Sequence, residues 1–250
     1  MRNFIWNRDP QEAMDNPYEY EAQEQFRNES EKLIKELRKY LITEYSFKLN
    51  EKTSEKAIYM LAINALDSAF EIVQSLKSQS HRVTAHLLRT IDESIDLGVF
   101  FNSKSEKSKR KVEKWFNNEM IPHREYRDYI KSKEGVEKFE QERKKYIDIS
   151  KFSHNSYKTL LYSYVQRSDE TIVHGNTYES GILIPIQTIA MYHAISGFYF
   201  KKIAFKMVEF EFIELEKMLK IMLDSQEENT IERKFEMRKK LQLTPCKKNC

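Results

Sequence analysis

The chain has few residues that interrupt regular structure and few that could crosslink it. Its 250 residues include 5 glycines, 5 prolines and 2 cysteines. So few breakers argue against the many turns of a β-sandwich or barrel and predict a small number of long elements. The two cysteines, Cys246 and Cys250, are both within the final five residues, so no disulfide can join distant parts of the fold. This cysteine usage favours a reducing compartment, and we expect a cytoplasmic protein.

An excess of one charge is also absent. The 42 basic and 39 acidic side chains leave a formal net charge of +3, so no global field would attract nucleic acid or an anionic membrane. Any basic surface that contacts such a partner must therefore be confined to one part of the chain. The basic segment over residues 104–117 ends near Trp115 and Phe116, and it could meet nucleic acid through phosphate contacts and stacking. Its interspersed acidic residues equally suit a solvated connecting helix.

One long stretch has no charged residue, from Ser180 to Phe200 (SGILIPIQTIAMYHAISGFYF). It reaches the length of about 18 apolar residues at which a membrane span is considered. However, it contains Gln187, His193 and Ser196, and polar side chains at this density are costly in lipid but ordinary in the core of a helical bundle. We therefore expect a buried central helix and no membrane contact.

Apolar residues recur at spacings of three and four along most of the chain, which is the helical period. The fold class predicted is mainly α, a multi-helix bundle or array of about seven to nine helices with no significant sheet. We expect an N-terminal arm over residues 1–17, a helical domain over 18–224, and a charged C-terminal helix and tail over 225–250. The expected helices occupy residues 18–45, 80–101, 104–117, 134–150, 154–165, 185–223 and 227–241. A second helix in chain order starts at residue 53 or 54 and has a wide apolar face from Ile58 to Val73, another starts near Pro122, and a loop covers 166–181. Thr53 or Ser54 could cap the second helix.

A polar stripe follows one face of the helix expected over residues 80–101. Its members are Arg82, His86, Arg89, Glu93 and Asp96, which recur at spacings of four, three, four and three. One explanation is a solvated face with an Arg89–Glu93 pair, which contributes only about 0.3 to 0.5 kcal/mol. The other is a stripe that faces an interior cleft, where the arginine and glutamate could hold an anion or orient a histidine.

A second polar group follows at YIDISKFSHNSYKTLL, from Tyr146 onward. Ser150, His154 and Tyr157 share one helical face if the helix is continuous, whereas Ser153 could instead cap a helix that starts at His154. A histidine among hydroxyl groups suits acid–base chemistry because its ordinary pKa is about 6.5. The alternative is a structural histidine that only makes hydrogen bonds.

The segments AHLLRTIDESIDLGVFF, from Ala85, and YIDISKFSHNS resemble an uncharacterised family of bacterial helical proteins with an Arg-x-x-x-Glu helix and a later Ser-x-x-x-His. They are also distantly similar to the HEPN class of helical bundles, many of which are toxins or phage-defence ribonucleases that use an arginine and a nearby histidine. The resemblance covers residues 57–165. The resemblance implies that the functional residues are Arg89, Glu93, Ser150 and His154.

The chain departs from the HEPN pattern in one respect. HEPN ribonucleases place the arginine a few residues before the histidine on one helix, and no arginine occupies that window before His154. The arginine would have to come from the neighbouring helix, with Arg89 stabilising a phosphorane and His154 acting as acid or base.

Three functional hypotheses follow. The first is a HEPN-like protein that binds or cleaves RNA, as a phage-defence or toxin-type metal-independent ribonuclease; the second is a non-enzymatic module for protein–protein interaction; the third is a bundle whose polar stripe lines a small-ligand pocket. No metal-ligand motif and no cofactor fingerprint is present, and we expect a homodimer. For the first hypothesis the expected catalytic residues are Arg89, Glu93 and His154, and the expected substrate-binding residues are Arg82, His86, Ser150, Lys151, Asn155 and Tyr157.

Overall fold

The computed structural model describes residues 20–78, 81–153, 157, 164–166, 172–174 and 186–227. These residues confirm the mainly α fold. They form eight helices: α2 (Tyr20–Glu44), α3 (Ser54–Lys77), α4 (His81–Phe101), α5 (Glu106–Phe116), α6 (His123–Glu134), α7 (Val136–Ser153), α9 (Ile186–Glu209) and α10 (Leu215–Asp224).

The described residues also contain two short strands, β1 (Tyr164–Gln166) and β2 (Ile172–His174). They pair as an antiparallel ribbon in which Val165 lies opposite Val173. The expected helix over 154–165 was therefore wrong at its C-terminal end, since Tyr164 and Val165 are extended. Both positions are β-formers at the edge of the expected loop, where cross-strand pairing competes with the helical period.

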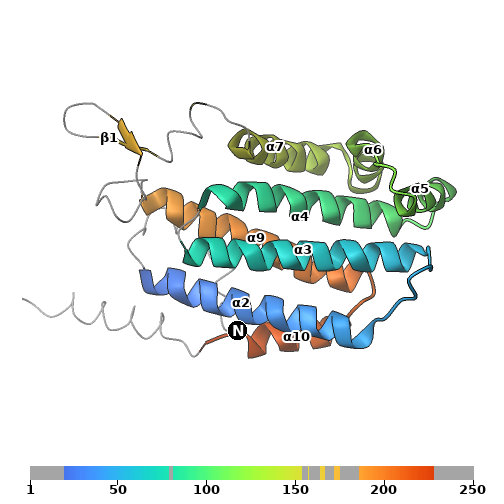
Figure 1. Ribbon diagram of the computed structural model, residues 1–250, viewed down its shortest axis with the longest axis horizontal. Helices are drawn as coiled ribbons and strands as arrows, with labels where there is room; N and C mark the ends of the chain where they lie inside the picture. The colour runs from blue at the N-terminus through green and yellow to red at the C-terminus, as the bar shows by residue number, and fades with distance from the viewer. Residues whose placement is uncertain are drawn as a thin grey trace, which may run out of the picture.

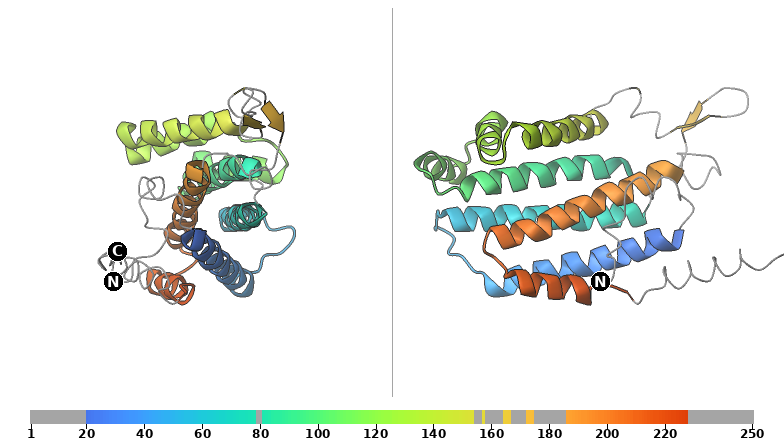
Figure 2. Two further views of the ribbon diagram at one scale, coloured as in Figure 1. Left: turned by 90° about the vertical axis from the view of Figure 1, so that its left-hand side faces the viewer. Right: turned by 180° about the vertical axis from the view of Figure 1, so that it is seen from behind.

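The helices lie in layers along one long axis (Figure 1). Figure 1 shows α2, α3 and α4 side by side, with α6 and α7 on the far side of α4 and α10 below α2. Helix α9 crosses obliquely over α3 and α4 on the opposite face, as the two turned views show (Figure 2). Helix α4 thus contacts α3, α5, α6, α7 and α9, which makes it the centre of the array.

Polar side chains of α4 hold two of these neighbours. Asp92, which is only 5% exposed, accepts a 2.6 Å hydrogen bond from the hydroxyl of Tyr199 on α9. Two residues later, Ser94 accepts a 2.8 Å hydrogen bond from Asn64 on α3. A helix turns by about 100° per residue, so side chains at nearby positions of α4 face different neighbouring helices.

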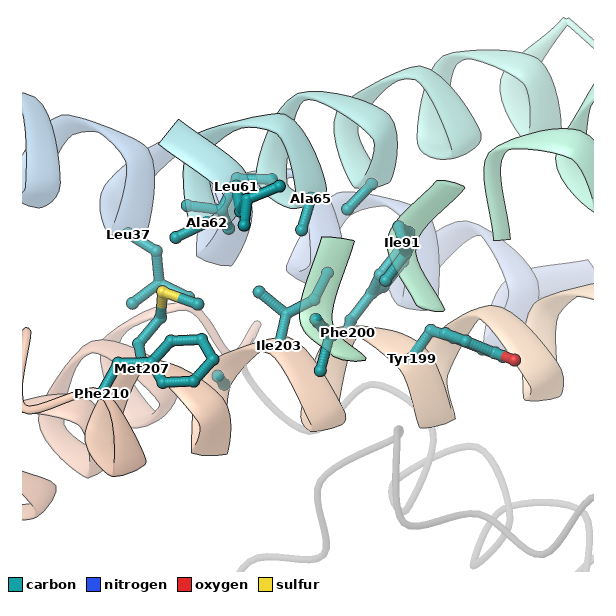
Figure 3. Packing of buried hydrophobic residues seen from close by; sticks show 14 of the residues in the cluster. Leu37, Leu61, Ala62, Ala65, Ile91, Tyr199, Phe200, Ile203, Met207 and Phe210 are labelled. Atoms are coloured by element: carbon teal, nitrogen blue, oxygen red, sulfur yellow. The ribbon is translucent and has the colours of Figure 1, made fainter. Parts of the chain in front are cut away.

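The apolar core lies between α2, α3, α4 and α9. Figure 3 shows Phe200, Ile203 and Met207 of α9 in the cluster with Leu37 of α2, Ala65 of α3 and Ile91 of α4. Small residues on α3 such as Ala62 and Ala65 let α9 approach closely, because they leave room for its larger side chains. The apolar face of α3 therefore forms a large part of the core.

The expected single helix over 185–223 was wrong, because α9 ends at Glu209 and α10 begins at Leu215. Glu211 has a positive φ of 61°. Its N–H bonds the carbonyl of Val208, and the N–H of Phe212 bonds the carbonyl of Met207. These two bonds form a Schellman motif, which usually has glycine or asparagine at the position of Glu211. The buried Phe210, Phe212 and Ile213 secure the turn by packing into the core.

The boundary between α6 and α7 also differs from the expectation. Gly135, with a φ of 88°, separates the two helices, so Glu134 ends α6 rather than starting the next helix. Pro122 directly precedes α6, which confirms the expected helix start near that residue. Helix α7 continues through Ser150 to Ser153.

Part of the charge-free run lies in α9, where His193 and Ser196 are buried. Within the described ranges, none of the helices combines the length and hydropathy that crossing a membrane requires. Residues 1–19 and 228–250 fall outside the described part, so the expected arm and most of the expected C-terminal helix do as well.

Candidate functional site

Side chains from three helices converge on one carboxylate oxygen, Oε1 of Glu93. Glu93 Oε1 accepts a 2.7 Å hydrogen bond from Arg89 Nε on α4 and a 3.0 Å hydrogen bond from the hydroxyl of Tyr146 on α7. His123 Nε2, on α6, lies 3.2 Å from the same oxygen. We call Arg89, Glu93, His123 and Tyr146 the Glu93 cluster.

Helical spacing and packing account for the positions of these residues. Arg89 and Glu93 are one turn apart on α4, so their pairing is local. His123 is the first residue of α6, directly after Pro122, and α6 and α7 both pack on α4. The ring centroids of His123 and Tyr146 are 5.9 Å apart. The site therefore depends on how three helices meet.

Arg127, one turn after His123 on α6, completes the surroundings of the cluster. Its guanidinium carbon lies 3.7 Å from the centroid of the Tyr146 ring, while that of Arg89 lies 5.5 Å from the same centroid. Two cations therefore flank one tyrosine ring, an arrangement in which the ring quadrupole attracts each of them.

The environment fixes the protonation states of the cluster. Burial would raise the pKa of Glu93, but the hydrogen bonds from Arg89 and Tyr146, with the nearby His123, hold this pKa below its usual range. Burial, together with the positive charges of Arg127 and Arg89, holds the pKa of His123 below its usual range, although Glu93 raises it. Burial and the neighbouring Glu93 raise the pKa of Tyr146. At neutral pH the cluster thus holds an ionised carboxylate, a neutral imidazole and a protonated phenol.

Two hollows lie on either side of the cluster. The first is a cavity of about 330 Å³ between α4, α6, α7 and α9, which we call the α9 cavity; Arg127 and Tyr146 form part of its wall. The second is an open cleft of about 1090 Å³ between α3, α4, α5 and residues 118–122, lined in part by Glu93 and His123. The cluster is therefore accessible from both sides.

The wall of the α9 cavity has an excess of positive charge. Three carboxylates, those of Asp92, Asp96 and Glu134, face five basic side chains. Asp92 accepts a 2.7 Å hydrogen bond from Lys202 in addition to that from Tyr199, so this carboxylate is already compensated. The basic residues of the wall are Arg127, Arg143, Lys201, Lys202 and Lys206.

A metal site would need several acidic or imidazole ligands in one place. Over the described ranges, no three or more His, Cys, Asp or Glu side chains lie close enough together to hold a metal ion. The oxygen of Glu93 that faces His123 is surrounded by basic and hydroxyl donors, which compete with a cation for that oxygen.

The structure brings together Arg89 and Glu93 of the expected catalytic set, while His154 lies outside the described residues. Among the expected substrate-binding residues, Ser150 is one turn from Tyr146 on α7 with its hydroxyl oxygen buried. The others do not join the cluster in the described part of the chain: His86 and Lys151 are exposed, Tyr157 is 76% exposed, and Asn155 and the Arg82 side chain lie outside the description.

Sequence reasoning assigned no role to His123, Arg127 or Tyr146. The spacing of His123 and Arg127 places them on one face of α6, but nothing in the neighbouring sequence indicates that this face meets Glu93.

Family models, curated proteins and solved structures give no match to this chain. The functional interpretation therefore depends on the chemistry of the Glu93 cluster and of the hollows beside it.

Proposed function

We propose that this protein cleaves RNA without a metal ion and that the Glu93 cluster is its active centre. The observation that supports this proposal is the convergence of Arg89, His123 and Tyr146 on one carboxylate oxygen. A neutral imidazole oriented by a carboxylate, with an arginine beside it, supplies a base and an electrostatic stabiliser for phosphoryl transfer.

Each residue has a defined task in the reaction. Glu93 accepts the Nε2–H of His123, which leaves Nδ1 as the proton acceptor. Nδ1 takes the proton of a ribose 2′-hydroxyl as its oxygen attacks the adjacent phosphorus. The bond from phosphorus to the 5′ oxygen breaks, and water protonates that leaving oxygen while His123 returns its proton to solvent. The products are a 2′,3′-cyclic phosphate and a 5′-hydroxyl end.

Arg89 stabilises the charge that develops on the phosphorane. Its Nε donates to Glu93, and its side chain is 35% exposed, so guanidinium N–H groups that Glu93 does not use can meet an anion from solvent. This use of Arg89 and Glu93 agrees with the HEPN-like resemblance of residues 57–165, which implies the same reaction class and a toxin or phage-defence role. His123 then supplies the base that the resemblance placed at His154.

The test is cleavage of total cellular RNA by the purified full chain in the presence of EDTA. We expect cleavage by the wild type, and its loss in His123→Ala, Arg89→Ala and Glu93→Gln. Arg124→Ala is the matched control, because Arg124 adjoins His123 in sequence but its side chain is 90% exposed. A His154→Ala variant tests the residue that the sequence indicated.

Two results would overturn the proposal. Intact RNA with the wild type would show that the cluster does not cleave RNA under these conditions. Cleavage that continues in His123→Ala but stops in His154→Ala would assign the chemistry to another centre.

A second candidate function is protein binding without catalysis. Three leucines on one face of α10, Leu215, Leu219 and Leu223, are 49%, 39% and 52% exposed, and they recur at the spacing of a helical stripe. Such a stripe suits contact with a protein partner or a second copy of the chain. This alternative gains support if the protein leaves RNA intact and sedimentation shows a dimer.

A further inference from the structure

The α9 cavity has the size of a site for one small ligand. Its volume is about 330 Å³, near the lower end of the roughly 300 to 1,000 Å³ that small-molecule pockets span. Helices α6 and α7 pack on one side of α4 and α9 packs on another, so the cavity is framed by rigid elements. Its wall includes Arg127 and Tyr146, which connects it to the Glu93 cluster.

Arg127 is a basic group of this wall whose guanidinium lies over an aromatic ring. Its guanidinium stacks on the ring of Tyr146, and in the described part of the chain no carboxylate lies within ion-pair distance of it. The five N–H donors of a guanidinium lie in its plane, so stacking fixes this plane without using the donors. A partly buried guanidinium without a carboxylate partner attracts a phosphate, which it can bind through two parallel hydrogen bonds.

Aromatic side chains complete the wall. Phe198 and Phe205, two turns apart on α9, are 42% and 41% exposed, although the fold has a large core that could have buried them. Both line the cavity, together with Phe139 of α7. Exposed rings around a basic cavity provide faces on which a planar base can stack.

We propose that the α9 cavity binds one unstacked nucleotide, with its phosphate on Arg127 and its base against the phenylalanines of α9. This inference rests on the proposed RNA cleavage and names the substrate class, which is single-stranded RNA. A base that is paired in a duplex cannot enter a cavity of this size, whereas a single strand can turn one base outward. The adjoining phosphate is then brought toward Arg89 and His123.

The test is binding, measured by calorimetry on the full chain, so that it does not depend on cleavage. The probe is a single-stranded pentanucleotide with 2′-O-methyl groups, which lacks the attacking hydroxyl. We expect Arg127→Ala to weaken its binding by roughly tenfold or more, the effect of losing one charged hydrogen-bonding group. Phe205→Ser should weaken it as well, while Arg124→Ala, on the exposed face of α6, leaves it unchanged.

Further arms distinguish the source of the nucleotide. A duplex of the same sequence should bind weakly. Binding of AMP through Arg127 without binding of the pentanucleotide would support the cavity as a nucleotide site and assign it to a free nucleotide instead of RNA. Equal affinity for inorganic phosphate and AMP, or equal affinity of the wild type and Arg127→Ala, would overturn the inference.

The failure of this inference is separable from the failure of the proposed function. Pentanucleotide binding that requires Arg127, with total RNA left intact, would retain the cavity and reject cleavage. Cleavage that requires His123, with wild-type binding unaffected by Arg127→Ala, would retain the active centre and reject the cavity.

Discussion

At the residue scale, Glu93 and His123 influence each other's protonation. Glu93 favours the charged imidazole through its negative charge, whereas burial and the positive charges of Arg127 and Arg89 together favour the neutral one more strongly. The balance leaves the imidazole able to accept a proton at neutral pH. Arg89 and Tyr146 meanwhile keep Glu93 ionised.

This balance predicts the titration of His123. Its pKa should lie below the ordinary value of 6.5, because burial has the largest effect. In Glu93→Gln the pKa should fall further, since the substitution removes a negative charge that raises it. The imidazole resonances followed by NMR against pH would measure both values. A wild-type pKa above 6.5, or a rise in Glu93→Gln, would contradict the prediction, and Arg124→Ala serves as the control.

The sequence could predict only the local half of this site. Arg89 and Glu93 are one helical turn apart, so their pairing follows from the period alone. Tyr146 reaches Glu93 across a separation of 53 residues, and that contact depends on how α7 packs against α4. His123 had no local signal, because its partners become visible only when the helices are assembled.

At the scale of the element, helix ends are defined by specific hydrogen bonds. Thr53 is the N-cap of α3, and its hydroxyl oxygen accepts a 3.2 Å hydrogen bond from the N–H of Lys56. The sequence offered Thr53 and Ser54 as alternatives for this cap, and the structure has Thr53. The sequence could not indicate the end of α9, because Glu211 is an unusual residue for positive φ and is held there by the burial of the aromatic residues beside it.

The cap gives a direct prediction. Thr53→Ala should lower the free energy of unfolding by about 1 kcal/mol, because an N–H of the first turn of α3 loses its acceptor. Thr43→Ala is the control, since Thr43 is exposed near the end of α2 and its hydroxyl bonds only the carbonyl of Lys39 within the same helix. Urea unfolding followed by circular dichroism measures both changes. Equal stability of the two variants would show that the cap contributes nothing.

At the scale of the whole molecule, one apolar core connects the helices that carry the candidate site. The helical period of the sequence predicted that helices of this chain contribute apolar faces to a shared core. The order in which the helices pack was not predictable, since several arrangements bury the same faces. The position of α9 across α3 and α4 is a property of the assembled core.

The core predicts a large difference between two leucines. Leu66 is 0% exposed and Leu49 is 92% exposed. Leu66→Ala should destabilise the protein by about 3 kcal/mol, through lost burial and the cavity left behind. Leu49→Ala should stay within about 0.5 kcal/mol of the wild type. Thermal unfolding of both variants is the measurement, and a loss of less than about 1 kcal/mol in Leu66→Ala would contradict a single tightly packed core.

The central position of α4 has a consequence for how this chain can change in evolution. Asp92 holds α9, Glu93 holds α6 and α7, and Ser94 holds α3. One residue inserted before them would rotate all three by about 100° and misdirect every one of these contacts at once. Among descendants of this sequence, insertions and deletions should therefore collect in connections between helices, while the length of α4 stays fixed.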